Sequence, residues 1–171
     1  MRSTPTLVEV ALLLLWLGGA IFFAAIVAPS LFATLPTRTL AGVVVGRVLP
    51  SIFYAGMVVG LVTVVLDRQA RGEFNWRGGA TGGIVILLSC AVAQFLIAPR
   101  IERVRASIGG AIESLPADDP RRAEFGRLHA VSVGWLGIAM LCAAIVAIIA
   151  ARSLHRTVAA ERSPLPGIVD R

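Results

Sequence analysis

Charged residues are scarce in this 171-residue chain, and lysine is absent. Only 15% of the residues are Asp, Glu, Lys or Arg, whereas a soluble globular domain has roughly 25%. Hydrophobic residues make up 57% of the chain. This balance excludes an ordinary soluble domain, and we infer that lipid surrounds most of the protein.

Cysteine and histidine are also rare. Cys90 and Cys142 both lie in apolar runs, so the sequence has neither a disulfide framework nor a zinc-ligand spacing. His129 and His155 lie near opposite ends of one apolar run, which argues against a haem held by two histidines. We expect no cofactor and no metal centre. Soft-metal binding by the cysteines, His129 and Met140 stays open as an alternative.

Catalytic motifs are missing as well. The sequence has no Gly-rich phosphate loop, no nucleophile elbow and no paired carboxylates at the centre of an apolar run. His129 and Ser132 are spaced for contact on one helix but lack an orienting acid. We therefore do not expect an enzyme. The 16 basic residues are arginines in loops and at the ends of apolar runs, which suits lipid head groups; without a soluble basic domain, we expect no nucleic acid partner.

What the chain does contain is four runs without charge, at residues 10–28, 48–66, 78–99 and 128–151. Each reaches the roughly 18 to 20 residues that cross a bilayer as a helix. Their lack of alternation argues against barrel strands. We predict an all-α integral membrane four-helix bundle, with one domain over 1–156 and spans at about 7–28, 43–66, 78–98 and 127–151.

Between the third and fourth spans we predict an amphipathic extramembrane helix from Pro99 to about Leu115. Its apolar positions repeat at helical spacing, and four charged side chains are expected to turn away from them: Arg100, Glu102, Arg103 and Arg105. Asp119 followed by Pro120 is typical of a helix start. Residues 67–79 form a short polar connection, and residues 157–171 are predicted to be a disordered tail.

Polar side chains gather at one level of the predicted bundle. We call side B the membrane side that carries the predicted loops 29–42 and 99–127. Helical rise and spacing bring five side chains from three spans toward this side, a candidate polar pocket: Arg47, Tyr54, Gln94, His129 and Ser132. Head-group anchoring with hydrogen bonds between helices is the alternative. Glu9 lies at the opposite surface, where we expect a solvated or arginine-paired carboxylate.

Glycines recur at four-residue intervals, as in Gly42 with Gly46 and Gly56 with Gly60. Such pairs favour close helix packing in lipid, within one bundle or between copies. Two functions compete: transport of, or tolerance to, a small solute, ion or metal, and a non-enzymatic scaffold that binds a membrane protein or a second copy. The arginines divide evenly between the two sides, so their number does not choose an orientation. We expect the protein in the bacterial inner membrane with both termini in the cytoplasm.

Four stretches together carry a resemblance: WLGGAIFFAAIVAPSLF at 16–32, AGVVVGRVLPSIFYAG at 41–56, FLIAPRIERVR at 95–105 and FGRLHAVSVGWL at 125–136. The chain resembles the bacterial members of the transmembrane protein 205-like group, which are small four-helix membrane proteins. The resemblance implies four spans, a helix-packing role for Gly18, Gly19, Gly46 and Gly56, and shared positions that include Arg47, Tyr54, His129 and Ser132. A eukaryotic relative is associated with resistance to platinum drugs.

Overall fold

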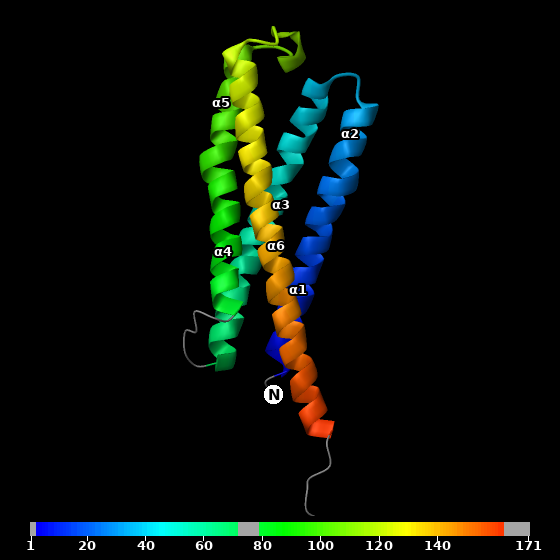
Figure 1. Cartoon of the computed structure of the whole chain (residues 1–171), viewed down its shortest axis with the longest axis vertical. Helices are drawn as coiled ribbons and strands as arrows, with labels where there is room; N and C mark the ends of the chain where they lie inside the picture. Colours follow the sequence, from blue (N-terminus) through cyan, green and yellow to red (C-terminus); the bar gives the residue numbers. More distant parts are fainter. Residues whose placement is uncertain (1–2, 72–78, 163–171) are drawn as a thin grey trace, which may run out of the picture.

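The protein is a bundle of four long helices. A computed structural model describes residues 3–71 and 79–162. In these residues, four helices are long and apolar enough to cross a membrane: Pro5–Thr34, Arg38–Gln69, Gly79–Ile108 and Pro120–Arg156. In Figure 1 the N-terminus and the end of the last helix lie at one end of the bundle, and side B lies at the other. The predicted all-α membrane four-helix bundle is confirmed.

Two of the four spans are built from more than one helical segment. The first and third spans each contain a short π-helix, and a single turn of 3-10 helix lies in the link before the fourth span. The elements in order are α1 (Ser3–Phe22), η1 (Phe23–Val27), α2 (Ala28–Thr34), α3 (Arg38–Arg71), α4 (Gly79–Ala91), η2 (Val92–Ile97), α5 (Ala98–Ile108), η3 (Ile112–Ser114) and α6 (Pro120–Arg162).

Several predicted boundaries differ from the observed ones. The first span does not end at residue 28 but continues through Pro29 to Thr34, because the π-helical turn before the proline accommodates its missing N–H. The amphipathic helix is a continuation of the third span and ends at Ile108, where Gly109 adopts the left-handed conformation (φ 66°) that stops helices. Its predicted extension to Leu115 is wrong.

The two ends of the fourth helix differ in how well they were predicted. The amide of Arg121 donates to Oδ1 of Asp119 at 2.8 Å, which confirms Asp119 as the N-cap of α6. At the other end α6 runs to Arg162, into the segment predicted to be disordered from residue 157. The sequence has no proline or glycine between residues 138 and 163 that would stop the helix. The rest of the predicted tail lies outside the described residues.

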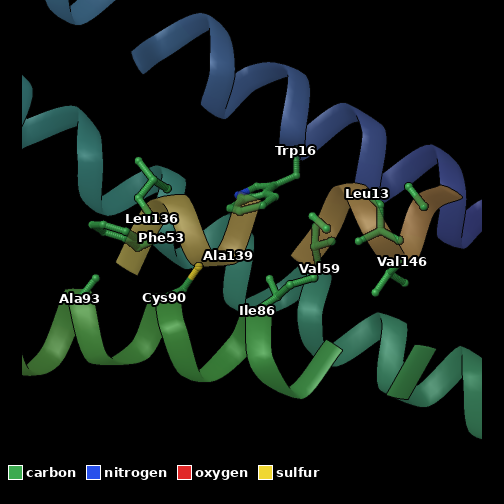
Figure 2. Close-up of a cluster of buried hydrophobic side chains, with 12 residues drawn as sticks. Leu13, Trp16, Phe53, Val59, Ile86, Cys90, Ala93, Leu136, Ala139 and Val146 are labelled. Carbon is green, nitrogen blue, oxygen red and sulfur yellow. The ribbon is translucent and has the colours of Figure 1, made fainter. Parts of the chain in front are cut away.

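The core lies where α1, α3, α4 and α6 meet. Figure 2 shows side chains from all four helices in one cluster, which includes Leu13, Phe53, Ile86 and Leu136. Large apolar side chains also cover the outside, and Leu15 is 76% exposed. Since an exposed apolar surface suits lipid rather than water, the bundle is held together by close packing more than by the hydrophobic effect.

Glycines create the closest helix contacts. A Cβ built on Gly60 would lie 2.6 Å from the carbonyl oxygen of Gly83, and one built on Gly83 would lie 2.6 Å from that of Gly60. The backbones of α3 and α4 therefore touch at this crossing. At Gly56 an added Cβ would lie 2.6 Å from Sγ of Cys90. The indole N–H of Trp16, which covers the same glycine, donates to the carbonyl of Ile52 at 2.9 Å.

We expect Gly60→Ala to lower the thermal unfolding midpoint in detergent, because the added methyl group collides with the backbone of α4. Overpacking of this kind costs about 1–3 kcal/mol. Gly18→Ala is the matched control, since a Cβ there meets nothing within 4 Å. The midpoint can be followed by circular dichroism. Equal losses in both variants would contradict a direct α3–α4 contact.

Candidate functional site

Three of the five predicted pocket residues lie on surfaces that face other helices. Ser132 of α6 is 4% exposed. Gln94 belongs to η2, and its Oε1 is buried without a hydrogen-bond partner among the described residues. Tyr54 of α3 is half exposed, and its ring packs edge-on against Phe95 of η2 with centroids 6.2 Å apart. The π-helical segment η2 is thus the centre of this polar level.

The two cationic candidates lie further out. The side chains of Arg47 and His129 are exposed, and no hydrogen bond of either residue occurs in the described part of the chain. The His129 ring stacks on Phe125 one turn earlier on α6, with centroids 6.4 Å apart. The contacts therefore link Tyr54 to η2 but do not tie all five residues together, and the single pocket stays a prediction.

Arg105, which the sequence places on the outward face of the amphipathic helix, instead turns toward α3. Its guanidinium donates to the carbonyl of Gly42 at 3.3 Å and forms an ion pair with Glu102 at 2.9 Å. It also lies 5.8 Å from the ring centroid of Phe125. A Cβ on Gly42 or Gly46 would come within 3.4 Å of this guanidinium, so glycine at these positions makes room for it. Gly46 thus lies against the Arg105 side chain of α5.

A second contact on side B joins the link between α5 and α6 to the start of α3. The Thr39 hydroxyl donates to Oε2 of Glu113 at 2.6 Å, and the Thr39 amide donates to Oε1 at 3.4 Å. The amide of Ile112 donates back to the Thr39 hydroxyl at 3.1 Å. The Thr39 hydroxyl, followed by backbone amides, holds the pKa of Glu113 below its ordinary value. No sequence motif indicated this contact.

At the opposite end of the bundle, two carboxylates are buried. Glu9 of α1 is 7% exposed and Asp67 of α3 is 4% exposed. A Cβ on Gly79, the first residue of α4, would lie 2.8 Å from Oε1 of Glu9 and 3.2 Å from Oδ1 of Asp67. Negative charge is favourable at a helix N-terminus. The expectation of a solvated Glu9 is wrong, and Asp67 belongs to a helix rather than to a polar connection.

The two cysteines, which the sequence offers as soft-metal ligands, lie at helix contacts. No group of three or more His, Cys, Asp or Glu residues that could hold a metal ion occurs in residues 3–71 and 79–162. Cys90 is buried beside Gly56, and Cys142 of α6 donates to the carbonyl of Gly82 at 3.5 Å. Both thiols therefore take part in helix packing.

Comparison with known proteins places this arrangement in a family. The family described as domain of unknown function DUF4149 matches residues 11–109, which run from α1 to the end of α5. The chain belongs to the DUF4149 family. An uncharacterized protein of Aquifex aeolicus (strain VF5) is 33% identical over 97 residues, which are 57% of this chain and 69% of the relative. No solved structure gives a significant match. Arg47, Tyr54 and Gln94 lie in the matched region, whereas α6 lies beyond it.

We expect the Glu113 contact to stabilise the fold at neutral pH and to be lost in acid. Because the folded-state pKa is lowered, the stabilisation is present above the ordinary glutamate pKa of about 4.3 and disappears as the pH falls through the lower folded value. Glu113→Gln should therefore have a lower unfolding midpoint than the wild type at pH 7, and the gap should narrow at pH 3. Asp118→Asn, which changes an exposed carboxylate nearby, is the control. A gap that is the same at both pH values would argue against a charge-dependent contact.

Proposed function

We propose that this DUF4149 protein is a non-enzymatic membrane protein that transports, or confers tolerance to, a small solute or ion. In this proposal it lies in the bacterial inner membrane with both termini in the cytoplasm. The polar level around η2, with Gln94 and Ser132 inside and Tyr54, Arg47 and His129 further out, is the candidate path for the solute on side B. The observation that carries the proposal is the burial of polar groups within spans that could be packed with apolar side chains alone.

Gln94 and Ser132 are polar side chains within membrane spans, where polarity has an energetic cost. Lipid offers no hydrogen-bond partners, so a polar group in a span is expensive and usually faces other helices or a water-filled path. Ser132 is almost fully buried, and the buried Oε1 of Gln94 has no partner in the described chain. Alanine or leucine would fill such positions at lower cost. Retained polarity therefore supports a functional role over a packing role.

The resemblance to the transmembrane protein 205-like group supports the same proposal. The DUF4149 match gives a family of unknown function, and the four long apolar helices agree with a multi-pass membrane protein. The association of the eukaryotic relative with resistance to platinum drugs is the reason for including tolerance beside transport. Within the proposal, the solute need not be a metal, because the polar level consists of oxygen and nitrogen groups and both cysteines pack between helices.

We expect Arg47→Ala, His129→Ala and Gln94→Leu to change solute tolerance or flux while membrane abundance stays near that of the wild type. Growth of producing cells on a panel of monovalent and divalent metal salts would measure tolerance, and immunoblots of isolated membranes would measure abundance. Arg100→Ala and Gln69→Leu are matched controls, because both side chains are exposed. Arg100 lies on side B, and Gln69 lies at the far end of α3. A parallel loss of abundance in the first three variants would instead indicate a structural role.

A scaffold that binds a second copy is the other candidate, and one observation favours it. Gly18 and Gly19 of α1 and Gly134 and Gly137 of α6 are all exposed, and a Cβ on any of them meets nothing within 4 Å. Among residues 3–71 and 79–162, Gly18 and Gly19 therefore make no close contact, unlike Gly56. Small residues on an outer face permit close approach of another helix in lipid.

For this second candidate we expect Gly137→Leu to break the association of copies without destabilising the monomer, because the larger side chain has room only when no other helix lies on that face. Crosslinking in membranes and light scattering in mild detergent would report the number of copies. Gly126→Leu is the control on the same helix, since its surroundings are equally open. A wild-type protein that is monomeric by both measurements would remove this candidate.

A further inference from the structure

The first and third spans are interrupted in the same way. The segments IVAPS at 26–30 and LIAPR at 96–100 share an Ala-Pro pair after branched apolar residues. In the structure, each pair follows directly on a π-helix: η1 precedes Ala28, and η2 precedes Ala98. Prolines and π-helical turns in a membrane span often accompany functional sites.

Each interruption releases at least one backbone carbonyl. The amide of Ala28 donates to the carbonyl of Phe23, and the amide of Ala98 donates to that of Ala93. The following carbonyls, of Ala24 and Gln94, therefore lose their usual α-helical donor. Their donor in a π-helical pattern would be Pro29 or Pro99, and neither proline has an N–H. Both breaks thus leave an acceptor without a main-chain donor at the same relative position.

The rest of the bundle repeats as well. The chain consists of two hairpins that run in the same direction, α1 to α3 and α4 to α6. Each second helix carries a Gly-Arg pair near side B, in GRVLPS at 46–51 and GRLHAVS at 126–132. Both α1 and α4 pack between α3 and α6, and α2 packs on α3 as α5 packs on α6. Figure 1 shows the latter two pairs side by side at the side B end.

Repeated halves matter because many transporters bind their substrate at the interface of such repeats, at interrupted helices. Here η2 of the second half packs against α3 of the first half as well as against α6. The contact between Tyr54 and Phe95 crosses this interface. The second interruption therefore lies where the two halves meet.

The two interruptions differ in one decisive respect. At the first, the released carbonyl belongs to Ala24, whose side chain is an exposed methyl group. At the second, it belongs to Gln94, whose side-chain Oε1 is buried and has no hydrogen-bond partner in the described chain. One residue thus carries two acceptor oxygens within a lipid-spanning segment, where unsatisfied acceptors are costly.

We propose that the backbone carbonyl and side-chain amide oxygen of Gln94 bind a small monovalent cation at the interface of the two halves. Acceptor oxygens repel anions, and Mg²⁺ and Ca²⁺ require carboxylate ligands that η2 lacks. Neutral carbonyl oxygens are the ligands that hold monovalent cations in membrane filters. The inference rests on the proposed solute- or ion-handling function and names its ligand class.

The arginines nearest to this level do not oppose the cation directly. Arg47 is exposed at the outside of α3. Arg105 is paired with Glu102 and with the carbonyl of Gly42 on α3. Arg47 is thus exposed and Arg105 is paired, whereas Gln94 lies before Pro99 within the third span.

The test compares thermal unfolding midpoints of the full-length protein in detergent, in potassium or ammonium chloride and in choline chloride at equal ionic strength. Binding to the folded state raises the midpoint. We expect the small cations to raise it by about 3 °C or more relative to choline, and Gln94→Leu to lose this difference. Pro99→Ala should reduce it, because the new N–H can donate to a released carbonyl. Pro29→Ala, the matched change at the first interruption, should keep it.

Equal midpoints in all three salts, or a cation effect that persists in Gln94→Leu, would overturn the inference; the first result would mean that water satisfies the two oxygens. If Gln94→Leu does not fold, the two proline variants decide. A cation effect on the midpoint that is reduced in Pro99→Ala but kept in Pro29→Ala supports the site, and an equal effect in both overturns it. Flux of potassium or ammonium into proteoliposomes is a separate readout. A cation effect on the midpoint without flux upholds binding and removes transport. Flux that persists in Gln94→Leu together with an undiminished cation effect on its midpoint overturns the cation site alone.

Discussion

The absence of water from the bilayer is the constraint on which this structure depends. Every backbone amide and carbonyl in a span must find its partner inside the protein, so the four apolar runs can only be helices. A proline within a span breaks this pairing, because it has no backbone N–H to donate. The protein keeps the first and third spans helical through Pro29 and Pro99 by inserting π-helical turns before them. The helices continue, but each turn leaves a carbonyl without its usual donor.

The same constraint decides what holds the helices together. Apolar side chains gain little by leaving lipid, so association requires surfaces that fit closely. The crossing of Gly60 and Gly83 lets two backbones touch, and the hydrogen bond from Trp16 to Ile52 joins α1 to α3. Toward side B the pattern changes. There the helices extend beyond the apolar core, and polar contacts made by Arg105 and Glu113 join α5 and the following link to α3.

These two kinds of packing divide the molecule into regions with different roles. Its core is apolar and close-packed, one end holds the buried carboxylates Glu9 and Asp67 against the start of α4, and η2 with Gln94 lies midway along the third span. Buried polar groups in a membrane protein are retained against their cost in lipid. The interruption of the third span at η2, beside the buried Oε1 of Gln94 and between two similar hairpins, is the reason to seek the function of this DUF4149 protein there.

The sequence by itself determined the number of spans, their helical nature and the cap at Asp119, because these depend on local composition, length and turn chemistry. It also predicts that Gln94 and Ser132 lie at a similar depth, since helical rise is constant. Only the tertiary structure decided which way side chains face. Arg105 turns inward because Gly42 and Gly46, on a different helix, leave space for it, and Glu9 is buried because Asp67 and Gly79 come to it from distant parts of the chain. Such contacts depend on how helices rotate against one another, which the pattern along a single helix does not specify.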